Sequence, residues 1–220
     1  MNKDPTDMIW QIVPKLNHEM SRIRGNLLSA SEGKDLRTLI VSSALPKEGK
    51  TTTAVALAYG LVTQANTRVV LVDGNDKSPA LARVFQIPET PGLVGVLTGT
   101  ASLETAVCET HVPGLKVLPF GDVNHRGDLF SQTGFKELIT RLRDTCDYVI
   151  LDSSSLMTSS GATLATADFQ GVILVIRCES TKRVVVHESL DLLRRIHGNV
   201  LGVVLNRRVF HIPRFVFRWL

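Results

Sequence analysis

The chain has 220 residues, a net charge of +4 and 44% hydrophobic residues, enough for one domain with a sizeable core. Its longest unbroken apolar run, near residues 171–176, is far too short to span a membrane, and the N-terminus lacks the basic start and apolar core of a secretory signal. The three cysteines, Cys108, Cys146 and Cys178, are widely spaced, which predicts buried thiols in a reducing compartment rather than disulfides or a zinc site.

The basic excess of the chain lies at its C-terminal end. Residues 207–220 contain four arginines and no acid, and the remainder carries 21 basic and 21 acidic residues. A neutral body argues against a nucleic-acid-binding domain, which would present a broad basic face.

The first predicted element is an N-terminal helical segment, residues 1–30. Apolar residues recur with helical spacing over residues 8–28, interrupted by Pro14. We expect this segment to pack on the outside of a main domain, residues 31–208, which is followed by a basic aromatic tail, residues 209–220.

The main domain opens with a loop between a predicted strand and a predicted helix. The strand-like run covers residues 38–42, the loop residues 43–52, and the apolar helix-like run residues 52–61. The loop contains Gly49-Lys50-Thr51 and differs from the pattern G-x-x-x-x-G-K-[ST] in having Ala44 at the first glycine position.

Each part of this loop suits a bound phosphate. The backbone N–H groups of the loop and of the helix N-terminus point at phosphate oxygens, and the helix dipole favours negative charge. Gly49 allows close backbone approach, Lys50 reaches the β- and γ-phosphates, and the Thr51 hydroxyl is a ligand for Mg²⁺. The loop therefore predicts a nucleoside triphosphate, ATP, with Mg²⁺.

Short apolar strands and helices alternate along the rest of the domain. The predicted strands are residues 68–73, 115–119, 148–152, 171–177 and 200–206, and the predicted helices are residues 78–85, 133–142, 162–167 and 182–196. Strands this apolar are buried on both faces. The fold class is therefore α/β, a doubly wound, mainly parallel sheet in a three-layer α/β/α arrangement.

Two of the predicted strands end in an acid, Asp73 and Asp152. Ligands bind at the carboxyl ends of parallel strands, so both carboxylates are candidates for Mg²⁺ and nucleotide chemistry. The alternative is that an aspartate in this position caps the helix that follows.

Five ordered motifs resemble one family, the cytoplasmic bacterial tyrosine kinases (BY-kinases) of capsule and exopolysaccharide assembly, which are relatives of the MinD-like ATPases. The motifs are E-G-K-T, V-L-V-D-G-N-D-K-S-P, G-L-V-G-V-L-T-G, D-Y-V-I-L-D-S-S and G-V-V-L-N-R, within residues 20–208. The resemblance implies the P-loop NTPase fold, ATP and Mg²⁺, phosphoryl transfer to tyrosine, a homo-oligomer, and a membrane polysaccharide co-polymerase as partner. It also implies a cytoplasmic location, peripheral at the inner face of the plasma membrane.

The resemblance assigns roles to particular residues. Catalysis falls to Lys50, Asp73 and Asp152, and metal binding to Thr51, Asp73 and Asp152. Nucleotide contacts fall to Arg207 and to the loop residues Ala44, Lys47, Glu48, Gly49, Lys50, Thr51 and Thr52, and adenine-side contact falls to Asn206. Asn206 is equally suited to end a strand as a turn residue.

The chain also departs from the family. The pattern D-x-D-x-R-x-P has Asn75 at its second acid, and an amide cannot accept a proton as a base does. A later acid is replaced by Gly161, and the N-terminal E-x-x-R-x-x-R is only partly present, from Glu19. The tail has no tyrosine, because Tyr59 and Tyr148 are the only two and both lie in predicted core elements.

These departures leave alternatives open. The first alternative to a kinase is an ATP-driven switch that controls assembly with the membrane partner. The second is a MinD-like positioning ATPase, which fits less well because Leu45 stands where that group carries a lysine. The tail, residues 209–220, either docks on an anionic membrane or membrane partner or covers an apolar patch of the protein.

Overall fold

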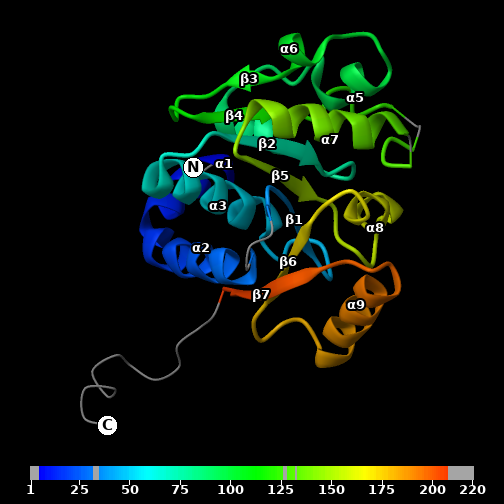
Figure 1. Cartoon of the computed structure of the whole chain (residues 1–220). Helices are drawn as coiled ribbons and strands as arrows, with labels where there is room; N and C mark the ends of the chain where they lie inside the picture. The colour runs from blue at the N-terminus through cyan, green and yellow to red at the C-terminus, as the bar shows by residue number, and fades with distance from the viewer. Residues whose placement is uncertain (1–4, 32–34, 126–127, 132, 208–220) are drawn as a thin grey trace.

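The computed structural model describes residues 5–31, 35–125, 128–131 and 133–207, so the tail 209–220 lies outside the described residues. Its centre is a seven-stranded sheet in the order β3-β4-β2-β5-β1-β6-β7 (Figure 1). The strands are β1 (Thr38–Ser43), β2 (Val69–Gly74), β3 (Cys108–Glu109), β4 (Leu115–Leu118), β5 (Tyr148–Ser153), β6 (Gly171–Arg177) and β7 (Val200–Asn206). Only β3 pairs antiparallel, with β4, so the mainly parallel sheet is confirmed.

Helices cover both faces of the sheet. One face carries α1 (Pro5–Ile12), the short 3₁₀ turn η1 (Val13–Leu16), α2 (Asn17–Ser31), α3 (Lys50–Ala65) and α4 (Leu81–Phe85). The other carries α5 (Gly92–Leu97), α6 (Leu103–Ala106), α7 (Thr133–Thr145), α8 (Ser160–Thr166) and α9 (Arg183–Arg195). Alternation along the strands feeds two cores: in β1, Leu39 and Val41 join the first and Ile40 the second. The three-layer architecture is therefore confirmed.

The N-terminal helices share a core with the nucleotide-binding fold. Val13 and Met20 are buried in the same core as α3. The Trp10 indole N–H donates to the carbonyl of Val84 in α4 at 2.7 Å, and its ring packs edge-on against Phe85. The segment is thus attached to α4 as well as to α3. The proposed division of the chain at residue 30 stays a prediction.

Most element boundaries lie within three residues of those predicted. The helix after the loop, α3, begins at Lys50 rather than Thr52, and α4 begins at Leu81 rather than Ser78. Pro79 and the backbone bonds that Asp73 accepts from Ala80 and Leu81 fix the later start of α4. The short elements β3, α5 and α6 were not predicted. Among the described residues, no helix is both long and apolar enough to cross a bilayer.

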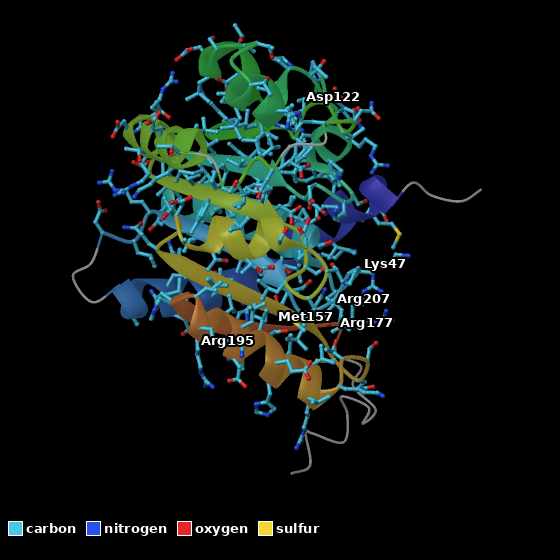
Figure 2. All side chains as sticks on the ribbon, turned by 90° about the vertical axis from the view of Figure 1, so that its right-hand side faces the viewer. Lys47, Asp122, Met157, Arg177, Arg195 and Arg207 are labelled. Carbon is cyan, nitrogen blue, oxygen red and sulfur yellow. The ribbon has the colours of Figure 1, made fainter. Side chains whose placement is uncertain are left out.

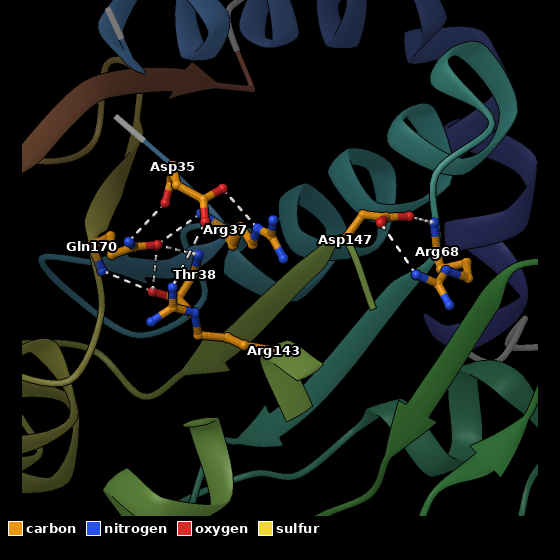
Figure 3. A network of polar contacts seen from close by, with 7 residues as sticks. All are labelled: Asp35, Arg37, Thr38, Arg68, Arg143, Asp147 and Gln170. Atoms are coloured by element: carbon orange, nitrogen blue, oxygen red, sulfur yellow. Dashed lines mark hydrogen bonds and ion pairs between the residues drawn. The ribbon is translucent and has the colours of Figure 1, made fainter. Parts of the chain in front are cut away.

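A polar cluster closes the end of the sheet where the strands begin (Figure 3). The Gln170 side-chain carbonyl accepts from the backbone N–H groups of Arg37 and Thr38 at 2.7 and 3.0 Å, and its amide donates to the Asp35 carbonyl at 2.8 Å. Just before β2, the Arg68 backbone N–H donates to the Asp147 carboxylate at 2.8 Å. Gln170 therefore joins the starts of β1 and β6.

We predict that Gln170→Ala lowers the free energy of unfolding by about 1–3 kcal/mol, because two backbone donors and one carbonyl lose their partners. Nucleotide affinity should not change, because the cleft described below lies at the opposite end of the strands. Denaturant unfolding with and without Mg-ADP measures both quantities.

The matched control is Asp191→Ala, which removes an exposed ion pair with Arg194 on α9 and should cost less than about 0.5 kcal/mol. Equal losses in the two variants would contradict the structural role of Gln170.

Candidate nucleotide-binding site

A cleft of about 800 Å³ opens at the carboxyl ends of the strands. Most of its walls come from three segments that are far apart in sequence: the loop between β1 and α3, the segment from β2 into α4, and the segment after β5. Ile9 of α1, Arg177 at the end of β6 and Arg207 after β7 complete them. The lining residues are Ile9, Pro46, Lys47, Gly49, Lys50, Thr51, Thr52, Asn75, Lys77, Ser78, Ala80, Arg83, Val84, Ser154, Ser155, Thr158, Arg177 and Arg207. Figure 2 shows Lys47, Arg177 and Arg207 at the same edge of the molecule.

The loop has a conformation that requires glycine at one position. Gly49 has φ of 101°, and a Cβ built on it would lie 1.9 Å from the Asn206 side-chain nitrogen. Any other residue would therefore displace Asn206 as well as strain the backbone. Lys47 also has a positive φ, 63°, and its exposed side chain lines the cleft.

Glu48 holds the loop in place from within. Its side chain is 2% exposed. One carboxylate oxygen accepts from the Leu45 backbone N–H at 2.8 Å, and the other from the Arg177 backbone N–H at 3.3 Å and from the Thr181 hydroxyl. The carboxylate thus connects the start of the loop to the end of β6, and these bonds turn it away from the cleft.

Asn206 acts on the loop from β7. Its side-chain amide donates to the Glu48 carbonyl at 2.8 Å, and its side-chain oxygen accepts from the Arg207 backbone N–H at 2.8 Å. Asn206 therefore both ends the strand and fastens the loop. Its contact with adenine stays a prediction, as does the nucleotide contact of Arg207, which lines the cleft.

Lys50 and Thr51 begin α3 at the floor of the cleft. Lys50 is 7% exposed, and burial lowers the pKa of its ammonium while the carboxylates of Asp152 and Glu48 oppose that shift. A desolvated ammonium at a helix N-terminus is a strong site for a phosphate oxygen. Thr52 lines the cleft one residue further along.

Asp152 is the least satisfied group of the site. It is fully buried, and neither carboxylate oxygen has a hydrogen bond of ordinary geometry. Burial, followed by the neighbouring Asp73 carboxyl, raises the pKa of Asp152 to about 7, while Thr51 and Lys50 lower it. A buried carboxylate without partners suits a cation, so Asp152 and Thr51 fit a bound Mg²⁺.

Asp73 stands opposite Asp152 on the adjacent strand but has other partners. Its oxygens accept from the backbone N–H groups of Asn75, Ala80 and Leu81 at 3.2, 2.9 and 2.9 Å. Burial raises the pKa of Asp73 to about 6, and these bonds act against that shift. The bonds support the capping interpretation, and a metal role for Asp73 stays a prediction.

The sequence-based site residues fall into two groups. Lys47, Gly49, Lys50, Thr51, Thr52 and Arg207 line the cleft, whereas Ala44, Glu48, Asp73, Asp152 and Asn206 lie behind its surface. Ala44 is fully buried and packs in the core. Among the described residues, no three His, Cys, Asp or Glu side chains cluster as a metal site.

The lining residues that were not predicted as site residues include the apolar Ile9 and three cations, Lys77, Arg83 and Arg177. Arg177 ends β6 just as Asn206 ends β7, and that position was the available signal. With Lys47, Lys50 and Arg207, the cleft has six cationic and no acidic lining residues in the part of the chain that the structure describes. Such a surface suits a polyphosphate.

Comparison with known proteins identifies the family. A family model described as an AAA domain matches residues 46–200, well over half of the chain. Tyrosine-protein kinase YwqD of Bacillus subtilis (strain 168) is 30% identical over 203 residues, which cover 91% of this chain and 85% of YwqD. The chain belongs to the BY-kinase family of P-loop ATPases. The expected family and its enzyme class, a kinase-like ATPase, are confirmed.

Other BY-kinase relatives agree. The crystal structure of the chimerical protein CapA2B2 has a TM-score of 0.82 at 26% identity, covering 88% of this chain and 85% of that one. Succinoglycan biosynthesis transport protein ExoP of Rhizobium meliloti (strain 1021) is 28% identical over 179 residues, 80% of this chain but 23% of ExoP. The expected P-loop NTPase fold is thereby confirmed.

We predict that Asp152→Asn raises the melting temperature of the nucleotide-free BY-kinase, because a neutral amide is cheaper to bury than an unpartnered carboxylate. The pKa of Asp152 is raised in the folded state, so the wild type loses stability relative to the variant as pH rises from about 4 to about 7. Thermal unfolding across this pH range measures the difference, which should level off above pH 7.

The same variant should lose most of the stabilisation that Mg-ATP gives to the wild type. Asp144→Asn, at an exposed acid on α7, is the control and should change neither quantity. A less stable nucleotide-free Asp152→Asn protein that still responds fully to Mg-ATP would contradict the metal assignment.

Proposed function

We propose that the protein transfers the γ-phosphoryl group of Mg-ATP to a tyrosine of a protein partner, in concert with a membrane polysaccharide co-polymerase of capsule or exopolysaccharide production. The observation that carries this proposal is the cleft itself: the Gly49 loop and six cationic residues line it, and the buried carboxylate of Asp152 lies behind it without a hydrogen bond of ordinary geometry. The names of YwqD and ExoP support the tyrosine and the polysaccharide pathway.

The residues of the cleft divide the chemistry among them. Backbone N–H groups of the loop and the N-terminus of α3 bind the phosphates, and Lys50 neutralises charge on the transferring group. Asp152 and Thr51 would hold Mg²⁺, which supplies further charge neutralisation when bound. Lys47, Arg177 and Arg207 line the cleft and would contact the bound nucleotide. The adenine contact of Asn206 and the nucleotide contact of Arg207 belong to this proposal.

A second function, an ATP-driven assembly switch without kinase activity, is favoured by one observation. Asn75 lines the cleft as an amide, with its side-chain oxygen accepting from Ser78 and Ser154. In this alternative, ATP drives binding to the membrane partner, and hydrolysis releases it. Homo-oligomerisation and a peripheral position at the inner face of the membrane belong to both versions, and the tail 209–220 is the candidate contact.

Incubation with ATP labelled on the γ-phosphate, with and without the cytoplasmic segment of the co-polymerase, separates the two functions. A kinase gives labelled phosphotyrosine on a partner protein, whereas a switch releases only inorganic phosphate. Phosphate on Tyr59 or Tyr148 is not expected, because both are half-buried within α3 and β5. Stoichiometric phosphate on either residue would contradict this prediction.

We predict that Lys50→Ala lowers ATP turnover at least about 100-fold in a folded protein, because the transferring phosphoryl group loses its principal buried cation. Lys116→Ala is the matched control: its side chain is exposed on β4 and pairs with Glu109, away from the cleft. Turnover and circular dichroism measured on both variants test the assignment, which normal turnover by Lys50→Ala would overturn.

A further inference from the structure

The proposed function requires a group that takes a proton from the attacking hydroxyl, and most carboxylates near the cleft are unsuited to it. Glu48 is bonded to the loop, Asp73 holds three backbone N–H groups, and Asp152 is buried as the candidate metal ligand. Asn75 lines the cleft but is an amide and cannot act as a base. Asp76, the next residue, is a carboxylate that is neither a candidate metal ligand nor bonded to backbone N–H groups of the loop, and side chains hold it instead.

Asp76 is connected to the cleft by a serine. The Ser154 hydroxyl bonds to one oxygen of the Asp76 carboxylate and lies 3.0 Å from the Asn75 side-chain oxygen. Ser154 is only 2% exposed, yet it lines the cleft while its hydroxyl contacts the Asp76 carboxylate, so Ser154 connects the two. The Ser159 hydroxyl bonds to the same Asp76 oxygen at 3.2 Å but does not line the cleft.

The surroundings of Asp76 allow it to exchange protons with solvent. Its side chain is 28% exposed, and its second oxygen pairs with the Lys77 ammonium at 3.3 Å. Across a neighbouring cavity of about 290 Å³ lie two further titratable groups, His125 and Asp128. One oxygen of the Asp76 carboxylate is therefore held by the two serine hydroxyls, and the other lies beside Lys77 in a side chain that solvent reaches.

We propose that Ser154 and Asp76 form a proton relay that serves the phosphoryl transfer. As the attacking oxygen bonds to the γ-phosphorus, its proton passes to the Ser154 oxygen, and Ser154 passes its own proton to Asp76. The bond between the γ-phosphorus and the bridging oxygen breaks, and its electron pair leaves with ADP. Asp76 then releases the proton to water. The attacking group is the acceptor hydroxyl or, in hydrolysis, a water molecule.

This inference rests on the proposed function and explains how a chain with an amide at position 75 retains a base. Asp76→Asn and Ser154→Ala should each lower kcat by about 10²–10⁴-fold, the usual contribution of general base catalysis. The double variant should be no slower than the slower single variant, because the two residues act as one unit. Asp76→Glu should recover part of the rate.

Three measurements separate a relay from a structural role. The Mg-ADP Kd should stay within about threefold of wild type in both variants, since neither residue holds the phosphate loop. Above pH 7, where Asp152 is ionised, Asp76→Glu should recover more of kcat than Asp76→Asn, because the glutamate can accept a proton whereas the amide offers only a hydrogen-bond acceptor to Ser154. In the nucleotide-free protein, the carboxyl carbon of Asp76 should shift in NMR spectra when Ser154→Ala removes its donor.

Ser159→Ala is the matched control, because it removes a hydroxyl from the same carboxylate without touching the cleft, and its kcat should stay within about threefold of wild type. A wild-type kcat in Asp76→Asn or Ser154→Ala overturns the relay, as does a fall in Mg-ADP affinity that parallels the fall in kcat. If Lys50→Ala abolishes turnover while Asp76→Asn does not, the relay alone fails. If Lys50→Ala is also active, the proposed function fails with it.

Discussion

The site depends on the interaction of one buried carboxylate, that of Glu48, with three parts of the chain. Leu45 begins the loop, Arg177 ends β6, and Thr181 precedes α9, and all three donate to Glu48. Asn206 adds a bond to the Glu48 carbonyl from the end of β7. The loop is therefore held from the ends of β6 and β7 before any phosphate arrives, and little ordering remains for the nucleotide to supply.

The electrostatics of the cleft also favour nucleotide binding. Among the described residues, the ionisable groups that line it are all cationic, and Lys50 is one of them and largely desolvated. Behind the lining, Asp152 has no hydrogen bond of ordinary geometry. In the free protein these charges are stabilised poorly, which costs folding free energy. A polyphosphate with a divalent cation offers a partner to each of them at once. The same burial that destabilises the free protein thus strengthens binding of Mg-ATP.

The sequence was sufficient for the parts of the fold that rest on local patterns. The strands 171–177 and 200–206 were predicted at their observed bounds because strongly apolar runs end at Arg177 and Asn206. The loop and its strand-end acids followed from spacing. By contrast, α5, only six residues with two glycines, has no periodic signal to read, and β3 is two residues long.

The unpredicted parts of the site arise from contacts between distant segments. Nothing near Glu48 in sequence indicates that its carboxylate turns towards Thr181, 133 positions away. Ile9 reaches the cleft only because Trp10 fastens α1 to α4. Likewise, the three bonds that Asp73 accepts depend on how the segment 75–81 folds back over the strand end. Spacing places such residues near the site but does not decide which face they present.

The two lost acids of the family pattern have a common structural setting. A Cβ at Gly161 would lie 2.8 Å from the Phe130 ring, which packs edge-on against Phe135 at 5.0 Å. A carboxylate at position 161 therefore requires the aromatic packing beneath α8 to change, and so its absence is tied to the core. Asp76 lines the same small cavity as Gly161. A negative charge therefore remains next to position 75, on a residue that bonds to Ser154 and does not itself line the cleft.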